Sequence, residues 1–486
     1  MTEREKIAHL LRRFGFGAGQ AEVDRYMPLG VNGALDRLIN YEKVDEQFTI
    51  PPWQFVFNKG TKDNNLDPRI FTNWWCTRMV MSQRPLQQKL ALFYSNLLVV
   101  GADKVDYGAM TIDYLQTLLD HAASDFHVIL SEVSKSPAMI KYLDNDHNLR
   151  GKPNENFGRE VMELFTLGIG NYSEQDVKEA ARAFTGWWYR YLVFEDDGHN
   201  YNDRVIEYVK MGLPMVAYCW IPDIHDTTPK TVLGKTKPYT GEELMEELAA
   251  RPETAKRIGT RLWEYFAYAN PPEKVKGKMA ASFKKHKGNA RLVLQDMAHM
   301  DEFWSKECVR QLVKSPADFV VPIIRQLDLG DAYHRAAGPP DPVQYIPPTV
   351  RHVGDVVSYN MDIMGLLPLH PPNVKGFDWG DAFINSNSMI KRMEFSGVLY
   401  DTLCDHHLGD KLRTTILAAK PKDETDAIRA LLNVFDAELP ESKVALLAGE
   451  LKKAGGVKPL QAKNSGTYPL VRVCKVLFGA PEFQLC

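Results

Sequence analysis

The chain has 486 residues, of which 44% are hydrophobic and 25% charged, and its formal net charge is -3. A chain of this length can bury one large core or two or three smaller ones. Nucleic acid and anionic membranes are not expected as partners, because proteins that bind them usually carry a basic patch or a high pI. The six cysteines are scattered, with no CxxC pair and no zinc-ligand spacing, so we expect reduced core residues.

The N-terminal stretch MTEREKIAHLLRRFGFGAG mixes charged residues with short apolar groups. No uninterrupted apolar segment follows it, as a secretory signal would require. The longest apolar run, LALFYSNLLVV from Leu90, is broken by Ser95 and Asn96 and is too short for the roughly 18 residues of a membrane span. We therefore expect a cytoplasmic protein without a membrane span.

Helical periodicity dominates the chain, and most of the expected helices have recognisable ends. Besides a charged helix described below, the expected helices cover 86–100, 111–130, a segment starting at Pro137, 173–185, 240–248, 252–266, 289–297 and 316–327. Ser173 and Asp176 have the spacing of a capping box. The pattern predicts a mainly α, multi-helix globular protein.

Strand signals are confined to aromatic and β-branched residues in 187–194 and 205–220, which predict a small β insertion at about 187–220. The segment 336–350 carries five prolines and cannot continue a helix. It predicts a linker or a loop between a main helical domain, 1–335, and a C-terminal helical region, 351–486. The second region is either a separate domain or part of the same one.

The stretch PNENFGREVMELFTLGIGNY, from Pro153, predicts a helix with one charged face. At about 100° per residue, Glu155, Arg159 and Glu163 form one stripe. Glu160 lies farther round, at about 140° from Glu155. Such a stripe is often a solvated face with ion pairs worth about 0.2 to 0.5 kcal/mol each.

Two features favour a site over a solvated face. Asn154 and Asn156 flank Glu155 with amide groups, and the helix ends at Gly168 and Gly170, where backbone can approach a ligand closely. An arginine between glutamates can hold one carboxylate ionised while a more buried one keeps its proton. The predicted catalytic groups are Glu155, Glu160 and Glu163, and the predicted substrate contacts here are Asn154, Asn156, Arg159 and Tyr172.

The same stretch resembles the signature of the bacterial family of domain of unknown function 1800. The matching motifs here are Asn154-Glu155-Asn156, Arg159-Glu160, Glu163-Leu164, Thr166-Leu167-Gly168, Tyr172 and Gln175-Asp176-Val177. The likeness continues through HLLRRFGFG, SPAMIKYLD, FTGWW, HDTTPKTVLG, Arg261-Leu262-Trp263, SPADFVV and PPNVKGFDWGDAFINS. Relatives often carry a Trp-His-Asn-His-Phe run where this chain has Phe93 to Leu98, so both histidines are absent. Many relatives also look exported.

A second candidate lies in IPDIHDTTPKTVLG, where His225 stands beside Asp226 and Lys230 follows. These groups could act as a base with its orienting partner or as a metal-ligand pair, and the plain alternative is a polar turn. The match to the family pattern favours a functional role. We expect His225 and Asp226 to share one pocket with the glutamates, with Lys230 and Trp187 among the substrate contacts.

These residues favour a hydrolase that uses a carboxylate acid/base pair, with a small molecule or, most plausibly, a carbohydrate as substrate. One alternative is a metal-dependent enzyme that uses His225, Asp226 and glutamates. The other is a non-catalytic binding or assembly protein whose charged helix docks a partner. No cofactor is predicted, a divalent metal is left open as an alternative, and the oligomeric state is not predicted.

Overall fold

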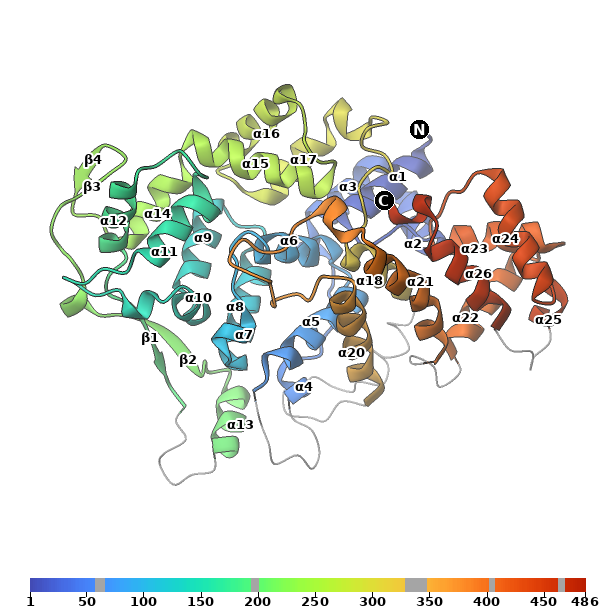
Figure 1. The fold of residues 1–486 in the computed structure, drawn as a ribbon, viewed down its shortest axis with the longest axis horizontal. Helices are drawn as coiled ribbons and strands as arrows, with labels where there is room; N and C mark the ends of the chain where they lie inside the picture. The colour runs from blue at the N-terminus through green and yellow to red at the C-terminus, as the bar shows by residue number, and fades with distance from the viewer. Residues whose placement is uncertain (57–65, 194–200, 328–347, 402–406, 462–467) are drawn as a thin grey trace.

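The computed structural model describes residues 1–56, 66–193, 201–327, 348–401, 407–461 and 468–486. Helices dominate this part of the chain, beside two antiparallel pairs of short strands (Figure 1). The prediction of a mainly α protein with a small β insertion is confirmed.

In Figure 1 the N-terminal helices begin right of the centre (dark blue), continue through the centre (light blue) and end on the left side (teal). Their bounds are α1 Glu3–Phe14, α2 Gln20–Tyr26, α3 Gly30–Ile39, α4 Trp53–Val56, α5 Pro68–Met81, α6 Pro85–Ser95, α7 Ala102–Val105, α8 Gly108–His121, α9 Phe126–Lys135, α10 Pro137–Tyr142, α11 Glu155–Glu160 and α12 Glu174–Ala183. Pro137 opens α10 and the Ser173–Asp176 capping box opens α12, as predicted.

The remaining helices run along one long edge and then form the orange-to-red end of the molecule (Figure 1). Their bounds are α13 Tyr201–Met211, α14 Gly241–Ala249, α15 Pro252–Phe266, α16 Glu273–Lys285, α17 Ala290–Ala298, α18 Pro316–Gln326, α20 Pro348–Ile363, α21 Ser386–Asp401, α22 His407–Ala418, α23 Glu424–Val434, α24 Glu441–Lys453, α25 Val457–Gln461 and α26 Tyr468–Phe478. Of the proline-rich segment, 336–347 lies outside the described residues, and 348–350 already belong to α20.

One hydrophobic cluster connects the two ends of the chain, from Ile7 in α1 to Phe483 after α26. Helix α20 packs against α5, and α21 packs against α26. The two termini lie near one another in Figure 1. Residues before and after the proline-rich segment therefore share one continuous core.

Three local expectations were wrong. The helix expected over 111–130 is divided, because α8 ends at His121 and the extended backbone of Asp125 interrupts the chain before α9 begins at Phe126. The strand expected to begin at Val205 begins at Val216 instead, because Val205 and Val209 are buried one turn apart in α13. Helix α6 ends at Ser95 and does not reach Val100.

Strand β1, Trp187–Tyr191, pairs antiparallel with β2, Val216–Trp220. Strands β3, Lys230–Val232, and β4, Lys235–Lys237, form a hairpin where the sequence suggested a loop. Its turn residues Leu233 and Gly234 both have positive φ, which is the geometry that a two-residue hairpin turn requires.

Candidate functional site

The charged helix of the signature stretch changes its winding in the middle. Helix α11 ends at Glu160, and Val161–Thr166 continue as a π-helical turn, in which the Thr166 hydroxyl donates to the Val161 carbonyl at 2.7 Å. A π-turn is wider than an α-turn and is frequently found at functional sites. The uniform rotation assumed in the sequence analysis therefore stops before Glu163.

The change separates the expected stripe into two groups. Arg159 bonds to Glu155 at 3.2 Å and to both oxygens of Glu174 in α12, at 2.8 and 2.7 Å. These side chains are 32%, 37% and 70% exposed, respectively. Glu155 and Arg159 therefore belong to a surface ion-pair group that ties α11 to α12.

Asn154 and Asn156 anchor the start of α11. The Asn154 side-chain oxygen caps the helix by accepting from the Asn156 backbone N–H at 3.0 Å, and the Asn154 side-chain nitrogen donates to the Asp144 carbonyl at 3.2 Å. The Asn156 side-chain nitrogen donates to the Leu143 carbonyl at 3.1 Å. Both asparagines hold the preceding loop against the helix.

Glu160 and Glu163 form the second group, with Tyr172. The Tyr172 hydroxyl donates a short hydrogen bond to Glu163. Burial and the negative charge of Glu163 raise the pKa of Glu160, and Arg159 and Lys375 oppose that rise. Burial, with the bond to Glu163, also raises the pKa of Tyr172. The two glutamates thus have unequal surroundings.

Helix α15 packs against the π-turn and adds cations to this group. The Arg257 side chain lies close to Gly168. A Cβ atom added to Gly168 would be 3.0 Å from the Arg257 Cδ. Burial and the neighbouring Arg261 lower the pKa of Arg257 to about 10, and the charge of Glu163 opposes this. The buried Nη1 of Arg257 has no hydrogen-bond partner among the described residues.

His225, Asp226 and Lys230 form a closed corner at the other end of α12. The Nδ1 of His225 lies 2.8 Å from the Thr185 carbonyl, and the side chain is nearly buried. Asp226 accepts from Arg182 at 2.8 Å and from the Thr228 amide at 2.9 Å. Lys230 donates to the backbone carbonyls of Asp226 and Thr228.

The pKa values in this corner agree with a structural role. Burial lowers the pKa of His225, and the hydrogen bond to the Thr185 carbonyl opposes this. Burial would raise the pKa of Asp226, but the Arg182 and Thr228 hydrogen bonds outweigh it and hold the pKa well below its usual range. Arg182, which binds Asp226, lies eight residues after Glu174 in α12. At the rise of an α-helix this is a distance of about 12 Å along the helix axis.

Trp187 is fully buried between Phe157, Phe184 and Tyr218, so its ring has no surface open to a substrate. No group of three or more His, Cys, Asp or Glu side chains that could hold a metal occurs in the described part of the chain. None of the described helices is long and apolar enough to cross a membrane.

A pocket of about 260 Å³ lies next to Arg257, one turn along α15 at Arg261. Its lining comes from α6 and the residue after it, α15 and the loop after it, the segment before α18 and the loop before α21. The lining residues are Phe93, Asn96, Arg261, Glu264, Tyr265, Ala269, Asn270, Leu312, Trp379 and Gly380. None of the residues singled out from the sequence as site residues lines it. In the sequence analysis Arg261 was named only as part of a family motif. The pocket could have been expected from the spacing of Arg257, Arg261 and Glu264, which places the three charged residues on one face of a helix.

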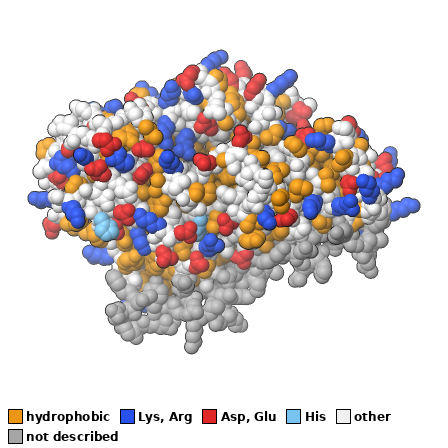
Figure 2. All heavy atoms as spheres, viewed as in Figure 1, with side chains coloured by type: hydrophobic (Ala, Val, Ile, Leu, Met, Phe, Trp, Pro, Cys, Tyr) orange, Lys and Arg blue, Asp and Glu red, His pale blue; other side chains and the backbone are white. Residues whose placement is uncertain are grey.

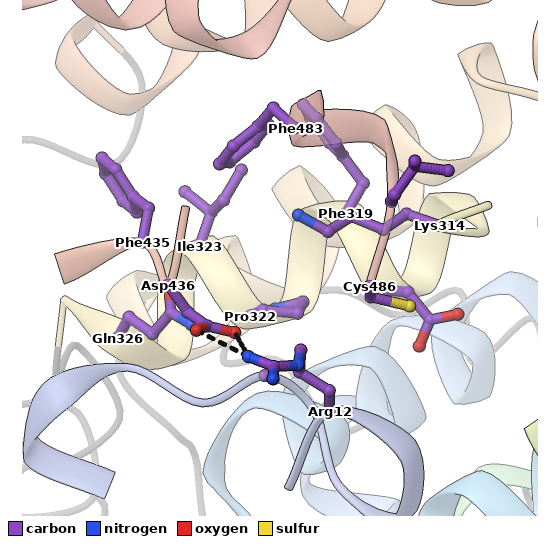
Figure 3. A pocket seen from close by; sticks show the side chains of 13 residues that line it. Arg12, Lys314, Phe319, Pro322, Ile323, Gln326, Phe435, Asp436, Phe483 and Cys486 are labelled. Carbon is purple, nitrogen blue, oxygen red and sulfur yellow. Dashed lines mark hydrogen bonds and ion pairs between the residues drawn. The ribbon is translucent and has the colours of Figure 1, made fainter. Parts of the chain in front are cut away.

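A smaller cavity near the termini has a different character (Figure 3). Arg12 of α1 forms a bidentate pair with Asp436 across it, at 2.8 and 2.9 Å. Arg310 donates to the same carboxylate at 2.8 Å. These ion pairs hold the end of α23 against α1, so we assign the charged residues of this cavity a structural role.

A family model described as "Protein of unknown function (DUF1800)" matches residues 9–485. The chain belongs to this family. No curated protein and no solved structure matches it.

Two of the DUF1800 motifs quoted above meet at the 260 Å³ pocket with the run in which this chain departs from the family pattern. The motifs are the Arg261-Leu262-Trp263 helix and the PPNVKGFDWGDAFINS loop, and the departing run is Phe93–Leu98. Asn96 connects this run to the loop, because its Oδ1 accepts from the Phe377 amide at 2.6 Å and its Nδ2 donates to the Phe377 carbonyl at 3.1 Å. The run in which this protein lacks the relatives' histidines thus forms one wall of the pocket.

Proposed function

We propose that this protein is a hydrolase in which Glu160 and Glu163 form a carboxylate acid/base pair that acts on a glycosidic bond. The observation that carries the proposal is the change to π-helix after Glu160, beside two glutamates with unequal surroundings. Glu155 is engaged by Arg159, so it is not a member of the proposed pair.

Glu160 is suited to donate a proton. Its pKa is raised by burial and by the adjacent negative charge, so the carboxyl keeps its proton to a higher pH than an ordinary glutamate. A general acid is most useful when its pKa is close to the working pH.

Glu163 is the proposed second member of the pair. It accepts a hydrogen bond from the Tyr172 hydroxyl, and the charge of Arg257 acts on it from α15. Two carboxyl groups are sufficient for hydrolysis of a glycosidic bond, which supports a carbohydrate substrate.

The test is release of reducing ends from a panel of soluble glycans by the purified protein. We expect Glu163→Gln and Glu160→Gln each to lower kcat about 100-fold or more, because general acid/base catalysis contributes roughly 10²- to 10⁴-fold. Glu155→Gln is the matched control, since it removes a charge from the same helix, and should retain most activity. Circular dichroism would verify that all three variants fold.

Two results would overturn the proposal. One is full activity of Glu163→Gln on any glycan that the wild type cleaves. The other is the absence of any reducing-end release by the wild type across the panel.

A further inference from the structure

Arg261 and Glu264 line the 260 Å³ pocket, from one face of α15, with opposite charges that the protein leaves unpaired. Neither side chain has a hydrogen bond or an ion pair with any described residue. Burial lowers the pKa of Arg261, and the charge of Glu264 opposes this change. The guanidinium nitrogens of Arg261 and the carboxylate oxygens of Glu264 are nevertheless more than 4.0 Å apart. Another Arg and Glu three residues apart do pair, since Arg182 and Glu179 lie 2.7 Å apart.

The pocket also has an aromatic part, formed by Tyr265 of α15 and Trp379 of the loop before α21. The Trp379 ring lies against Tyr265, with centroids 4.9 Å apart, and against Phe383 at 5.3 Å. The bonds from Asn96 to Phe377 fix the loop that carries Trp379. Gly376 has a φ of +84°, and a Cβ there would lie 2.3 Å from the Asn96 Oδ1, so only glycine allows this close approach.

The charges restrict the ligand. An anion alone would pair with Arg261 and face the Glu264 carboxylate, and a cation alone would face the guanidinium. A neutral ligand would remove water from both charged groups without replacing it by an opposite charge, which is costly. A ligand with one carboxylate and one ammonium group satisfies both, and its apolar portion can lie on the aromatic part of the pocket.

The pocket, at about 260 Å³, has room for a small ligand rather than a single water molecule. We propose that this pocket binds a zwitterionic small molecule of the α-amino acid class with an apolar side chain. Arg261 would receive its carboxylate, Glu264 its ammonium group and Trp379 its side chain. The proposal does not depend on the hydrolase activity.

Isothermal titration of the purified protein with L-phenylalanine and L-leucine tests the proposal. Two analogues separate the charges: 3-phenylpropionate lacks the ammonium group, and phenethylamine lacks the carboxylate. We expect saturable binding of at least one amino acid and at least tenfold weaker binding of both analogues. Glucose serves as the neutral probe and should not bind at this pocket.

Variants assign the binding to the pocket. Arg261→Gln and Glu264→Gln should each weaken amino acid binding at least tenfold, and Arg261→Lys should have an intermediate effect because it keeps the charge without the planar fork. Lys256→Gln is the matched control, because Lys256 lies on the same helix in an exposed pair with Glu273, and should bind as the wild type does. Thermal unfolding of each variant shows whether it is folded.

The proposal would be overturned if no amino acid bound at millimolar concentration, or if 3-phenylpropionate or phenethylamine bound as tightly as phenylalanine. Amino acid binding that Arg261→Gln, Arg261→Lys and Glu264→Gln all left unchanged would place the ligand elsewhere and would also overturn it. Glucose binding that Arg261→Gln abolished would identify the pocket as a sugar site instead.

Discussion

Two charged regions of this protein differ in whether their charges are paired. In the corner around Asp226, Arg182 and Lys230 direct their donors at nearby acceptors. On α15, Arg261 and Glu264 face a pocket with no partner among the described residues, and Arg257 has a buried nitrogen without one. Paired charges fix the position of the chain, whereas unpaired charges beside a pocket are available to a ligand.

The two regions contain residues of similar type in different surroundings. His225 beside Asp226 has the composition of a catalytic pair, but its hydrogen bonds are made to Thr185 and hold a turn. Arg261 and Glu264 look like an ordinary helix pair three residues apart, but they do not bond to each other. Substitutions in the two regions should therefore affect different properties.

The largest expected effect on stability is in the paired corner. Arg182→Ala should lower the free energy of unfolding by about 3 kcal/mol, because it leaves two mostly buried carboxylates, Asp226 and Glu179, without their cation. Urea denaturation followed by circular dichroism measures this. Arg261→Ala, in the unpaired region, should change the unfolding free energy by less than about 1 kcal/mol. Equal losses in the two variants would contradict the comparison.

A smaller effect is expected at Asp113 in α8, whose carboxylate has no ion pair with any residue that the structure describes and lines none of the pockets described above. Burial raises its pKa from 3.8 to about 6. The folded protein therefore binds this proton more tightly than the unfolded chain does, and stability falls as the pH rises through this range and stays lower above it. Asp113→Asn removes that cost and should raise the unfolding free energy by about 1 to 2 kcal/mol at pH 7.

The pH dependence distinguishes this explanation from a simple packing change. At pH 3.5 the carboxyl is mostly protonated in both states, so Asp113→Asn should have little effect there. Thermal unfolding at the two pH values measures the difference. A stabilisation of the same size at both would show that the charge is not its cause.

The smallest effect is expected at the surface pair. Arg159→Ala should lower the unfolding free energy by no more than about 1 kcal/mol, because Arg159, Glu155 and Glu174 are partly or mostly exposed and water screens their attraction. Added salt should reduce the difference further. A loss of 3 kcal/mol, as expected for Arg182, would show that exposure does not separate the two kinds of ion pair.

Much of the fold could be predicted because its signals are local. The capping box at Ser173 and the proline at the start of α10 are formed by neighbours in the sequence, and both are present. The split of the helix expected over 111–130 was missed, because hydrophobic periodicity alone continues across Ser124 and Asp125. The aromatic and β-branched residues after Val205 likewise favoured a strand, although burial on one side places Val205 and Val209 in a helix.

The amino-acid sequence by itself determined the helical character of the protein, the position of the β insertion and the charged stretch of the family signature, because all three depend on periodicity and on residues close together in the chain. The tertiary structure alone decided which charges are paired. Glu163, in the wider turn after Glu160, meets Tyr172 beyond the end of its helix, and Asn96 meets Phe377 across 281 positions of the chain. Whether a charged side chain finds a partner depends on such distant contacts, which no local pattern specifies.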